Sequence, residues 1–495
     1  MEQKALKVAN ILLIGGSAYC ALIFFYGSYV HGPTLHYNLL QIVLAAALLG
    51  ALRLRASHKI NFVLILLCVM TSAYLLELYL LFAAARHSNA HATMWLRFPS
   101  DISLETLKDR LSKGKHDDAN YDTRSRLEVI TDMRKSGIEA HPAVFSSVLL
   151  KWDKDGRTLR SQIMIDGEET LPLGGISNTR TVFCNENGQY TIYESDEHGF
   201  HNPTGIWKSA RMDIVTLGDS FTHGACVPSE QSFVGLIRNR YPATLNLGID
   251  DSGPVTMLAM LKEYGRHFRP KAVLWFYYEG NDLKDLKREH SSPLLMKYMA
   301  GPFAQGLIEK QEKIDSALRA YVDKAREAGR QSIQPEEIVK LRHLRAYVHS
   351  VLQKGQQGGS DQIMRNYFTM SASEATAEEL DLLRRALMEA QACVGKWGGR
   401  LYFVYLPEWP RYAKPELANK DRQRVLTLAR DLHLPVIDLH AAFTQHADPL
   451  SLFPFRRFGH YNSGGHRLVA QTVLHALSLP GGEPTVSHAS FPGES

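Results

Sequence analysis

The second half of the chain alternates short apolar runs with amphipathic stretches. The runs are rich in β-branched and aromatic residues and too short for helices, which is typical of buried strands. Strands that alternate with helices predict a parallel sheet covered by helices on both faces, an α/β fold. The expected strands are Asp213–Leu217, Thr244–Leu247, Ala272–Tyr278, Leu401–Leu406 and Leu434–Leu439. The expected helices include Ser232–Arg240, Val255–Phe268, Leu417–Leu432 and Gly464–Ala476.

The same pattern divides the chain into regions. Residues 191–480 hold the α/β domain, interrupted at 285–398 by a charged helical insertion that we expect over the carboxyl edge of the sheet, as a lid or substrate platform. Residues 91–190 form a mixed connecting region, with a helix near Arg124–Lys135 and a hairpin around Ile163–Thr170. The Pro-, Gly- and Ser-rich end, 481–495, predicts a disordered tail.

Residues 1–90 contain apolar stretches of membrane-spanning length. Val8–Val30 and Ile60–Ala85 are each long enough to cross a bilayer, and Leu39–Leu52 between them is short for a span. Basic residues precede the first stretch and follow the middle one, which satisfies the positive-inside tendency at both places only if the middle stretch also crosses. We therefore predict about three transmembrane helices in a cell inner membrane, with everything after about residue 86 facing the periplasm or exterior. The alternative is two crossings, which would put the basic cluster outside and the rest of the chain in the cytosol.

Composition narrows the classes of protein further. The 495 residues are 45% hydrophobic and carry a formal net charge of only +5, without a basic block interleaved with aromatics, so nucleic acid is not an expected partner. The five cysteines show no CxxC spacing, so we expect neither a metal site nor a cofactor. Outside the apolar N-terminal stretches lie Cys184, Cys226 and Cys393, which can form at most one internal bridge. For Cys226 itself we expect a small buried hydrophobe.

Four motifs follow the predicted strands and point to acyl transfer by a serine. Ser220, in LGDSFTHG, lies just past the first strand, where ligands of open α/β sheets bind. Gly248 in NLG and Asn281 in EGND follow the next two strands and would donate hydrogen bonds to an oxyanion, together with the Ser220 N–H. His460, in HYNSGGH near the C-terminus, is the candidate general base. The structural alternatives are a helix cap for Ser220, strand–helix packing for Gly248 and a turn for Asn281.

These motifs, in this order, resemble the SGNH (GDSL-type) hydrolase superfamily over roughly Tyr193 to Leu479. The resemblance implies a three-layer α/β/α sandwich around a five-stranded parallel sheet, the flavodoxin-like SGNH fold. It implies Ser220 as nucleophile, His460 as base, and an oxyanion hole formed by Ser220, Gly248 and Asn281. The N-terminal spans together with these motifs are also similar to membrane-anchored bacterial members associated with surface polysaccharides.

Two positions depart from the family pattern. The residue two before Asn281, usually glycine, is Glu279, which we expect to be a tolerated variant; the alternative is a carboxylate near the oxyanion. The acid that normally lies three residues before the histidine is replaced by Arg457. Either a backbone carbonyl orients His460, or another acid, such as Asp448 or Asp438, takes that role.

The sequence therefore predicts a membrane-anchored serine esterase that acts through an acyl-serine on acyl, chiefly acetyl, esters of an extracytoplasmic glycan or another small ester. One alternative is an O-acetyltransferase of a surface polysaccharide that uses the same serine. The other, motivated by Arg457, is a non-catalytic glycan-assembly subunit.

Overall fold

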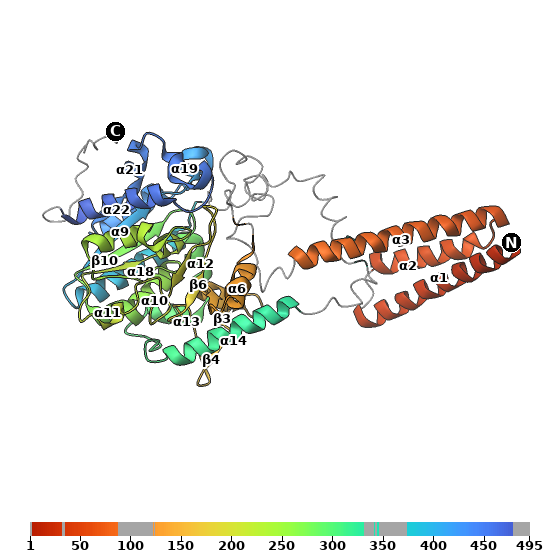
Figure 1. Cartoon of the computed structure of the whole chain (residues 1–495), viewed down its shortest axis with the longest axis horizontal. Helices are drawn as coiled ribbons and strands as arrows, with labels where there is room; N and C mark the ends of the chain where they lie inside the picture. Colours follow the sequence, from red (N-terminus) through yellow and green to blue (C-terminus); the bar gives the residue numbers. More distant parts are fainter. Residues whose placement is uncertain are drawn as a thin grey trace. The chain divides into compact units, whose positions relative to one another are not determined.

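The computed structural model describes residues 2–31, 35–87, 122, 124–330, 341, 344–345 and 374–478. The chain divides into two compact units, residues 1–88 with 331–357 and residues 89–330 with 358–495 (Figure 1). The expected tail at 481–495 lies outside the described residues, as does the middle of the expected insertion.

The first unit holds three helices, α1 (Glu2–His31), α2 (Leu35–Ala51) and α3 (Ala56–His87). They pack on one another through small and apolar side chains, and a Cβ on Gly16 would lie 3.2 Å from Leu48. Two stretches, Glu2–Leu22 and Ala56–Tyr79, are long and apolar enough to cross a membrane, whereas the apolar part of α2 is shorter. The crossing by α2, and with it the three-span topology, stays a prediction.

The second unit is built on a five-stranded parallel sheet. Its strands run in the order β12-β11-β10-β8-β9 and are parallel throughout. Numbered along the chain, this is the flavodoxin-like order 2-1-3-4-5, whose switch point falls between β8 and β10. The predicted α/β fold with five parallel strands is therefore confirmed. The strands are β8 (Ile214–Leu217), β9 (Thr244–Asn246), β10 (Ala272–Tyr278), β11 (Arg400–Leu406) and β12 (Val436–Asp438).

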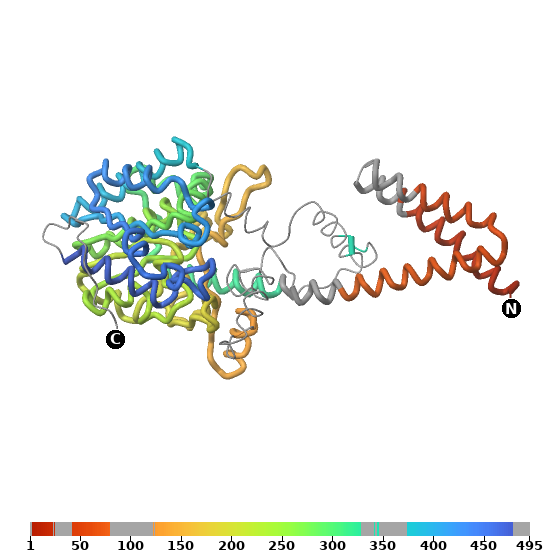
Figure 2. Tube along the Cα trace, turned by 90° about the horizontal axis from the view of Figure 1, so that it is seen from above, coloured from red at the N-terminus to blue at the C-terminus, as the bar shows by residue number. Residues whose placement is uncertain are grey.

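Helices cover both faces of the sheet, which makes three layers (Figure 1). The course of the chain through this unit can be followed by colour in Figure 2. Alternate residues of β10 enter different cores, because successive side chains of a strand point to opposite faces. Trp275 packs in one core with α10 (Pro254–Met260), α18 (Ala377–Gly395) and α20 (Arg422–Asp431). Phe276 packs in the other, with α9 (Phe233–Arg240), α21 (Leu439–Gln445) and α22 (Ser463–Ser478). Short helices in the connections are α8 (Ser220–His223), α11 (Arg266–Phe268) and α19 (Pro410–Ala413).

The connecting region packs against the sandwich. It holds the expected helix, α6 (Arg126–Lys135), and the expected hairpin of β4 (Ile163–Ile165) and β5 (Glu168–Thr170). Phe145, Leu171 and Leu173 of this region lie in the same core as the sheet. A small sheet pairs β1 with β6 and β6 with β7, and the β6–β7 hairpin projects residues 183–191. The remaining elements are β1 (Ala140–Pro142), α7 (Ser146–Leu149), β2 (Leu150–Trp152), β3 (Leu159–Ser161), β6 (Arg180–Val182) and β7 (Ile192–Glu194).

The described parts of the expected insertion belong to the body of the fold rather than to a lid. Helix α18 buries one side, including Leu383 and Leu387, in the core beneath the sheet, as the helix that precedes β11 must. Helix α14 (Gln311–Arg330) packs along β4, and its Asp315 accepts a hydrogen bond from the Ser177 N–H at 2.9 Å. These segments follow α12 (Asp282–His290) and α13 (Pro293–Met296).

Candidate active site

Ser220 is presented by a tight strand-to-helix turn. Strand β8 ends at Leu217, and α8 begins at Ser220 itself, with Asp219 as its N-cap. One oxygen of Asp219 accepts the Phe221 N–H at 3.0 Å. A Cβ on Gly218 would lie 2.1 Å from the Thr222 hydroxyl, so only glycine fits the turn. The serine therefore sits at the carboxyl edge of the sheet, next to N–H groups that have no partner within their own helix.

His460 reaches this serine from the far end of the chain. Its Nε2 atom lies 2.8 Å from Ser220 Oγ, and its ring rests on Phe221 with centroids 4.8 Å apart. In the neutral imidazole, Nε2 accepts the Ser220 hydroxyl proton and Nδ1 carries the ring proton, an assignment made from the hydrogen bonds. The structure thus brings together the two residues that the sequence nominated as nucleophile and base.

The carboxylate against His460 comes from the connecting region. Glu186, in the β6–β7 hairpin, accepts the Nδ1–H of His460 on Oε1 at 3.0 Å and the His460 backbone N–H on Oε2 at 2.7 Å. Its side chain is 5% exposed. A Cβ on Gly459 would lie 2.7 Å from Glu186 Oε2, so glycine before the histidine makes room for the acid. Ser220, His460 and Glu186 form a continuous hydrogen-bonded row.

The two acids nominated from the sequence lie elsewhere. Asp448 forms an ion pair with Arg456 on the surface. Asp438 pairs with Arg422 and caps α21 by accepting the His440 N–H at 3.1 Å. Of the carboxylates in the described part of the chain, Glu186 is the one that hydrogen-bonds to His460. Sequence reasoning missed it because it precedes every recognised motif; Arg457 left open both a backbone carbonyl and another acid.

The surroundings of His460 favour its charged form. Burial lowers the pKa of His460, but the Glu186 charge and hydrogen bond, followed by Asp250 and Asp219, raise it to about 9. Burial also raises the pKa of Asp219 to about 7, against the opposing effects of the Phe221 N–H, the His460 charge and the Asn281 amide. The site therefore stabilises an imidazolium, which is the species a serine attack generates.

Gly248 and Asn281, the two predicted oxyanion donors besides Ser220, differ in their hydrogen bonds. Gly248 follows β9, and its N–H donates to Asn246 Oδ1 at 2.9 Å, so an oxyanion would have to share or displace that bond. A Cβ on Gly248 would lie 2.6 Å from Thr222, which makes this glycine necessary for packing against α8. Asn281 follows β10, and its Oδ1 is buried without a hydrogen-bond partner among the described residues. Its amide hydrogen-bonds to Asp219, the residue before Ser220, and its role as an oxyanion donor stays a prediction.

Glu279, the departure from the family pattern before Asn281, has a buried side chain that is bound by Arg411. Arg411 holds it through two hydrogen bonds, Nε to Oε1 at 2.7 Å and Nη2 to Oε2 at 2.5 Å. The Glu408 N–H and the Tyr405 hydroxyl donate to the same carboxylate, whose side chain is completely buried. This charge is paired and joins the ends of β10 and β11.

A disulfide links the β6–β7 hairpin, which carries Glu186, to the segment that follows α8. Cys184 is bonded to Cys226, and both are buried, so Cys226 is not the small hydrophobe expected from the sequence. Cys393 is free and buried in α18. Within the described residues, the one group with metal-ligating spacing is Glu186, Cys226 and His460. It does not fit a metal, because the sulfur is in the disulfide and the other two side chains bond each other.

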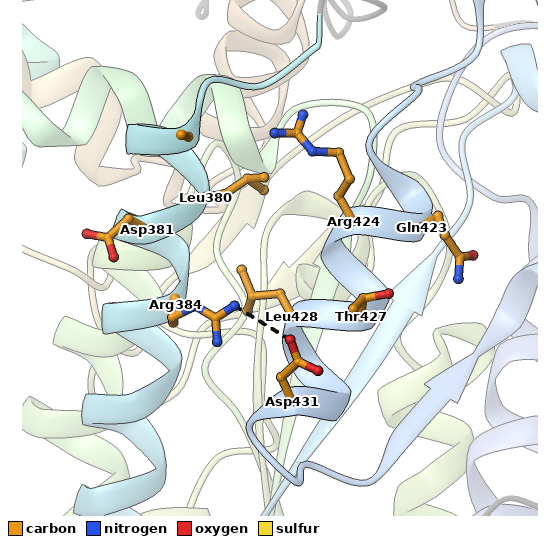
Figure 3. A pocket seen from close by; sticks show the side chains of 9 residues that line it. Leu380, Asp381, Arg384, Gln423, Arg424, Thr427, Leu428 and Asp431 are labelled. Atoms are coloured by element: carbon orange, nitrogen blue, oxygen red, sulfur yellow. Dashed lines mark ion pairs between the residues drawn. The ribbon is translucent and has the colours of Figure 1, made fainter.

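A hollow on another part of the domain carries none of this chemistry. It measures about 470 Å³ and lies between α18 and α20, crossed by an ion pair between Arg384 and Asp431 (Figure 3). Neither Ser220 nor His460 lines it.

The fold and the site define a three-layer α/β/α sandwich protein with a Ser–His–Glu row at the switch point of its sheet. No protein-family model and no curated protein matches the chain. Solved structures with a similar fold include a catalytic mutant of Axe2, an acetylxylan esterase from Geobacillus stearothermophilus (12% identity, 55% of this chain, 96% of that chain, TM-score 0.30). Others are a lipase/acylhydrolase from Enterococcus faecalis (13% identity, 54% and 95%, TM-score 0.30) and a member of the lipolytic protein G-D-S-L family from Veillonella parvula DSM 2008 (12% identity, 53% and 97%, TM-score 0.28). Likenesses at this level do not assign an activity to this chain.

Proposed function

We propose that this protein is a membrane-anchored serine esterase that removes acyl groups, chiefly acetyl, from an extracytoplasmic glycan. The observation that carries the proposal is the row of hydrogen bonds from Ser220 Oγ through His460 to Glu186, at 2.8 and 3.0 Å. Acyl transfer by serine requires a nucleophile, a base in contact with it and a carboxylate that orients the base.

Each residue then has one role. Ser220 Oγ attacks the ester carbonyl carbon while His460 Nε2 takes its proton, and the Ser220 N–H and Asn281 amide stabilise the oxyanion. Collapse expels the alcohol, which takes the proton back from His460, and leaves an acyl-serine. Water, deprotonated by the same imidazole, attacks the acyl carbon and releases the carboxylic acid and free serine. Glu186 holds the ring and stabilises the imidazolium in both steps.

Two features support an outward-facing site. Disulfides persist in oxidising compartments, and Cys184–Cys226 lies beside the catalytic row. Lys4 and Lys7 lie near the start of α1, and Arg53 and Arg55 lie between α2 and α3. This distribution is expected for an inner membrane with the second unit outside if α2 also crosses. An outward-facing esterase meets acylated glycans, and the motif resemblance to enzymes of surface polysaccharides points to the same substrates.

The test uses the full-length protein in detergent. We expect it to hydrolyse 4-nitrophenyl acetate and to release acetate from acetylated oligosaccharides, with Ser220→Ala reducing both to background. Ser316→Ala changes an exposed serine on α14 and serves as the matched control. A fluorophosphonate probe should label the parent protein stoichiometrically at Ser220. Hydrolysis that persists unchanged in Ser220→Ala would refute the serine assignment.

An O-acetyltransferase is a second candidate, favoured by one observation. Unit 1 has three packed helices, more than an anchor requires, and they could engage a membrane acyl donor. In that case a sugar hydroxyl replaces water in the second step, and acetyl appears on an added oligosaccharide faster than free acetate. The third candidate, a non-catalytic subunit, was motivated by Arg457, and the carboxylate of Glu186 beside His460 removes that motive.

A further inference from the structure

The hairpin that carries Glu186 lies outside the sandwich. Glu186 belongs to the β6–β7 loop. Among the described strands, β6 pairs with β1 and β7, and this small sheet is separate from the five parallel strands that precede the Ser220 and Asn281 turns. The distance between acid and base therefore depends on how this loop is attached to the α8 turn.

One covalent bond joins the β6–β7 loop to the segment after α8. Cys184, two residues before Glu186, is bonded to Cys226, six residues after Ser220, and the two Cα atoms are 5.1 Å apart. Asn187, on the other side of Glu186, donates its side-chain N–H to the Cys226 carbonyl at 2.6 Å. Glu186 thus has a residue on either side of it that is linked to Cys226.

Noncovalent contacts complete this interface. The Tyr193 hydroxyl lies 2.8 Å from His223 Nε2, and Phe183 stacks on the His223 ring with centroids 4.3 Å apart. These contacts join the base of the hairpin to the end of α8. At the tip, Asn185 Nδ2 donates to the Asp122 carbonyl at 2.7 Å, and the Asp122 N–H donates to the Gly188 carbonyl at 2.8 Å. The disulfide and the Asn187 bond tie this tip, which carries Glu186, to Cys226.

We propose that the Cys184–Cys226 disulfide is a positioning element of the catalytic site, which holds the Glu186 carboxylate against His460, so that full activity requires the oxidised protein. This inference rests on the proposed serine esterase function. Chain made in a reducing compartment would fold its sheet and present Ser220 and His460, yet lack a fixed acid. The enzyme would gain full activity only after the second unit reached an oxidising compartment.

The test compares the parent protein with Cys184→Ala/Cys226→Ala, both as full-length chains in detergent. Cys393→Ala, which removes the free buried cysteine of α18, is the matched control. We expect the double variant to lose at least tenfold in kcat for 4-nitrophenyl acetate with little change in KM. The alkaline rise of its rate should begin at lower pH, because the Glu186 charge no longer raises the pKa of His460. Cys393→Ala should keep the parent rate and profile.

A double-mutant cycle separates positioning from general stabilisation. In a Glu186→Gln background, loss of the disulfide should cost less than threefold, because the group it positions is already gone. A lower melting temperature with parental kcat and pH profile would overturn the inference, and so would equal losses of kcat in both backgrounds. If instead the parent protein hydrolyses esters without needing Ser220, the proposed function itself fails, whatever the cysteine variants show.

Discussion

Replacing Glu186 by glutamine tests the central assignment. The substitution keeps the size of a nearly buried side chain and one acceptor oxygen for the ring N–H of His460, but it removes the negative charge and the second acceptor oxygen. Since that charge is the main influence raising the pKa of His460, we expect the pKa to fall from about 9 toward or below its ordinary 6.5.

The size of the effect depends on pH. A pKa of about 9 rather than 6.5 corresponds to roughly 3 kcal/mol in favour of the imidazolium. Where the resting histidine is neutral, the transition state loses this stabilisation and kcat/KM should fall by about 10²-fold or more, because roughly 1.4 kcal/mol is a factor of ten. Below both pKa values the attraction exists in the resting enzyme and in the transition state alike, so it cancels and the loss should be less than about tenfold.

The assay is the pH dependence of kcat/KM between about pH 6 and 9.5. Ser220→Ala, measured at each pH, supplies the blank for spontaneous ester hydrolysis. We expect the parent rate to rise until about pH 9 and the Glu186→Gln rate to level off near neutrality, so that the defect grows with pH. Asp448→Asn and Asp438→Asn should follow the parent curve. A loss that is uniform across the range, or a variant whose curve rises at the same pH as the parent, would refute the reasoning.

Three further substitutions test other parts of the site. Asn281→Ala should lower kcat by about 10²–10³-fold without changing the melting temperature, whereas a residue that only shapes a turn would leave kcat intact. Arg411→Met leaves the Glu279 carboxylate buried and unpaired, so a thermal melt should shift down by on the order of 10 °C and recover in part when Glu279→Gln is added. Gly248→Ala forces a Cβ against Thr222, and we expect lower thermal stability together with lower turnover, since α8 must shift; parental melting would contradict the packing role.

The strands of the sheet could be predicted because each is encoded by a short, continuous stretch of sequence. Each strand is a short apolar run bounded by polar residues, and β10 carries seven consecutive residues with no charge. Burial on both faces requires this pattern, so the order of strands and helices follows from periodicity. The sequence predicts that the segment of α18 is helical but places it in an insertion, as a lid or substrate platform. An amphipathic pattern shows that a helix buries one face, but it does not show which surface that face packs against.

The pairing of Glu186 with His460 could not be predicted because it depends on contacts between distant parts of the chain. Glu186 and His460 are separated by 274 positions, and nothing in the sequence around Glu186 marks it as different from other polar loop residues. Asp448 and Asp438 are closer in sequence to the histidine, yet each lies beside an arginine that neutralises it. The pairing of Cys184 with Cys226 was likewise one of several that the sequence allowed.

The position of Glu186 extends the proposed catalytic site to residues that precede the recognised motifs. The motifs that resemble the hydrolase superfamily begin near Tyr193, but the carboxylate that orients the base precedes that point, on a hairpin anchored by its own small sheet and by the main core through Leu171 and Leu173. Glu186 accepts both the ring and the backbone N–H of His460, so the proposed mechanism takes its acid from Glu186 and needs none at position 457. The connecting region, which carries no motif of its own, thus supplies a residue of the proposed active site.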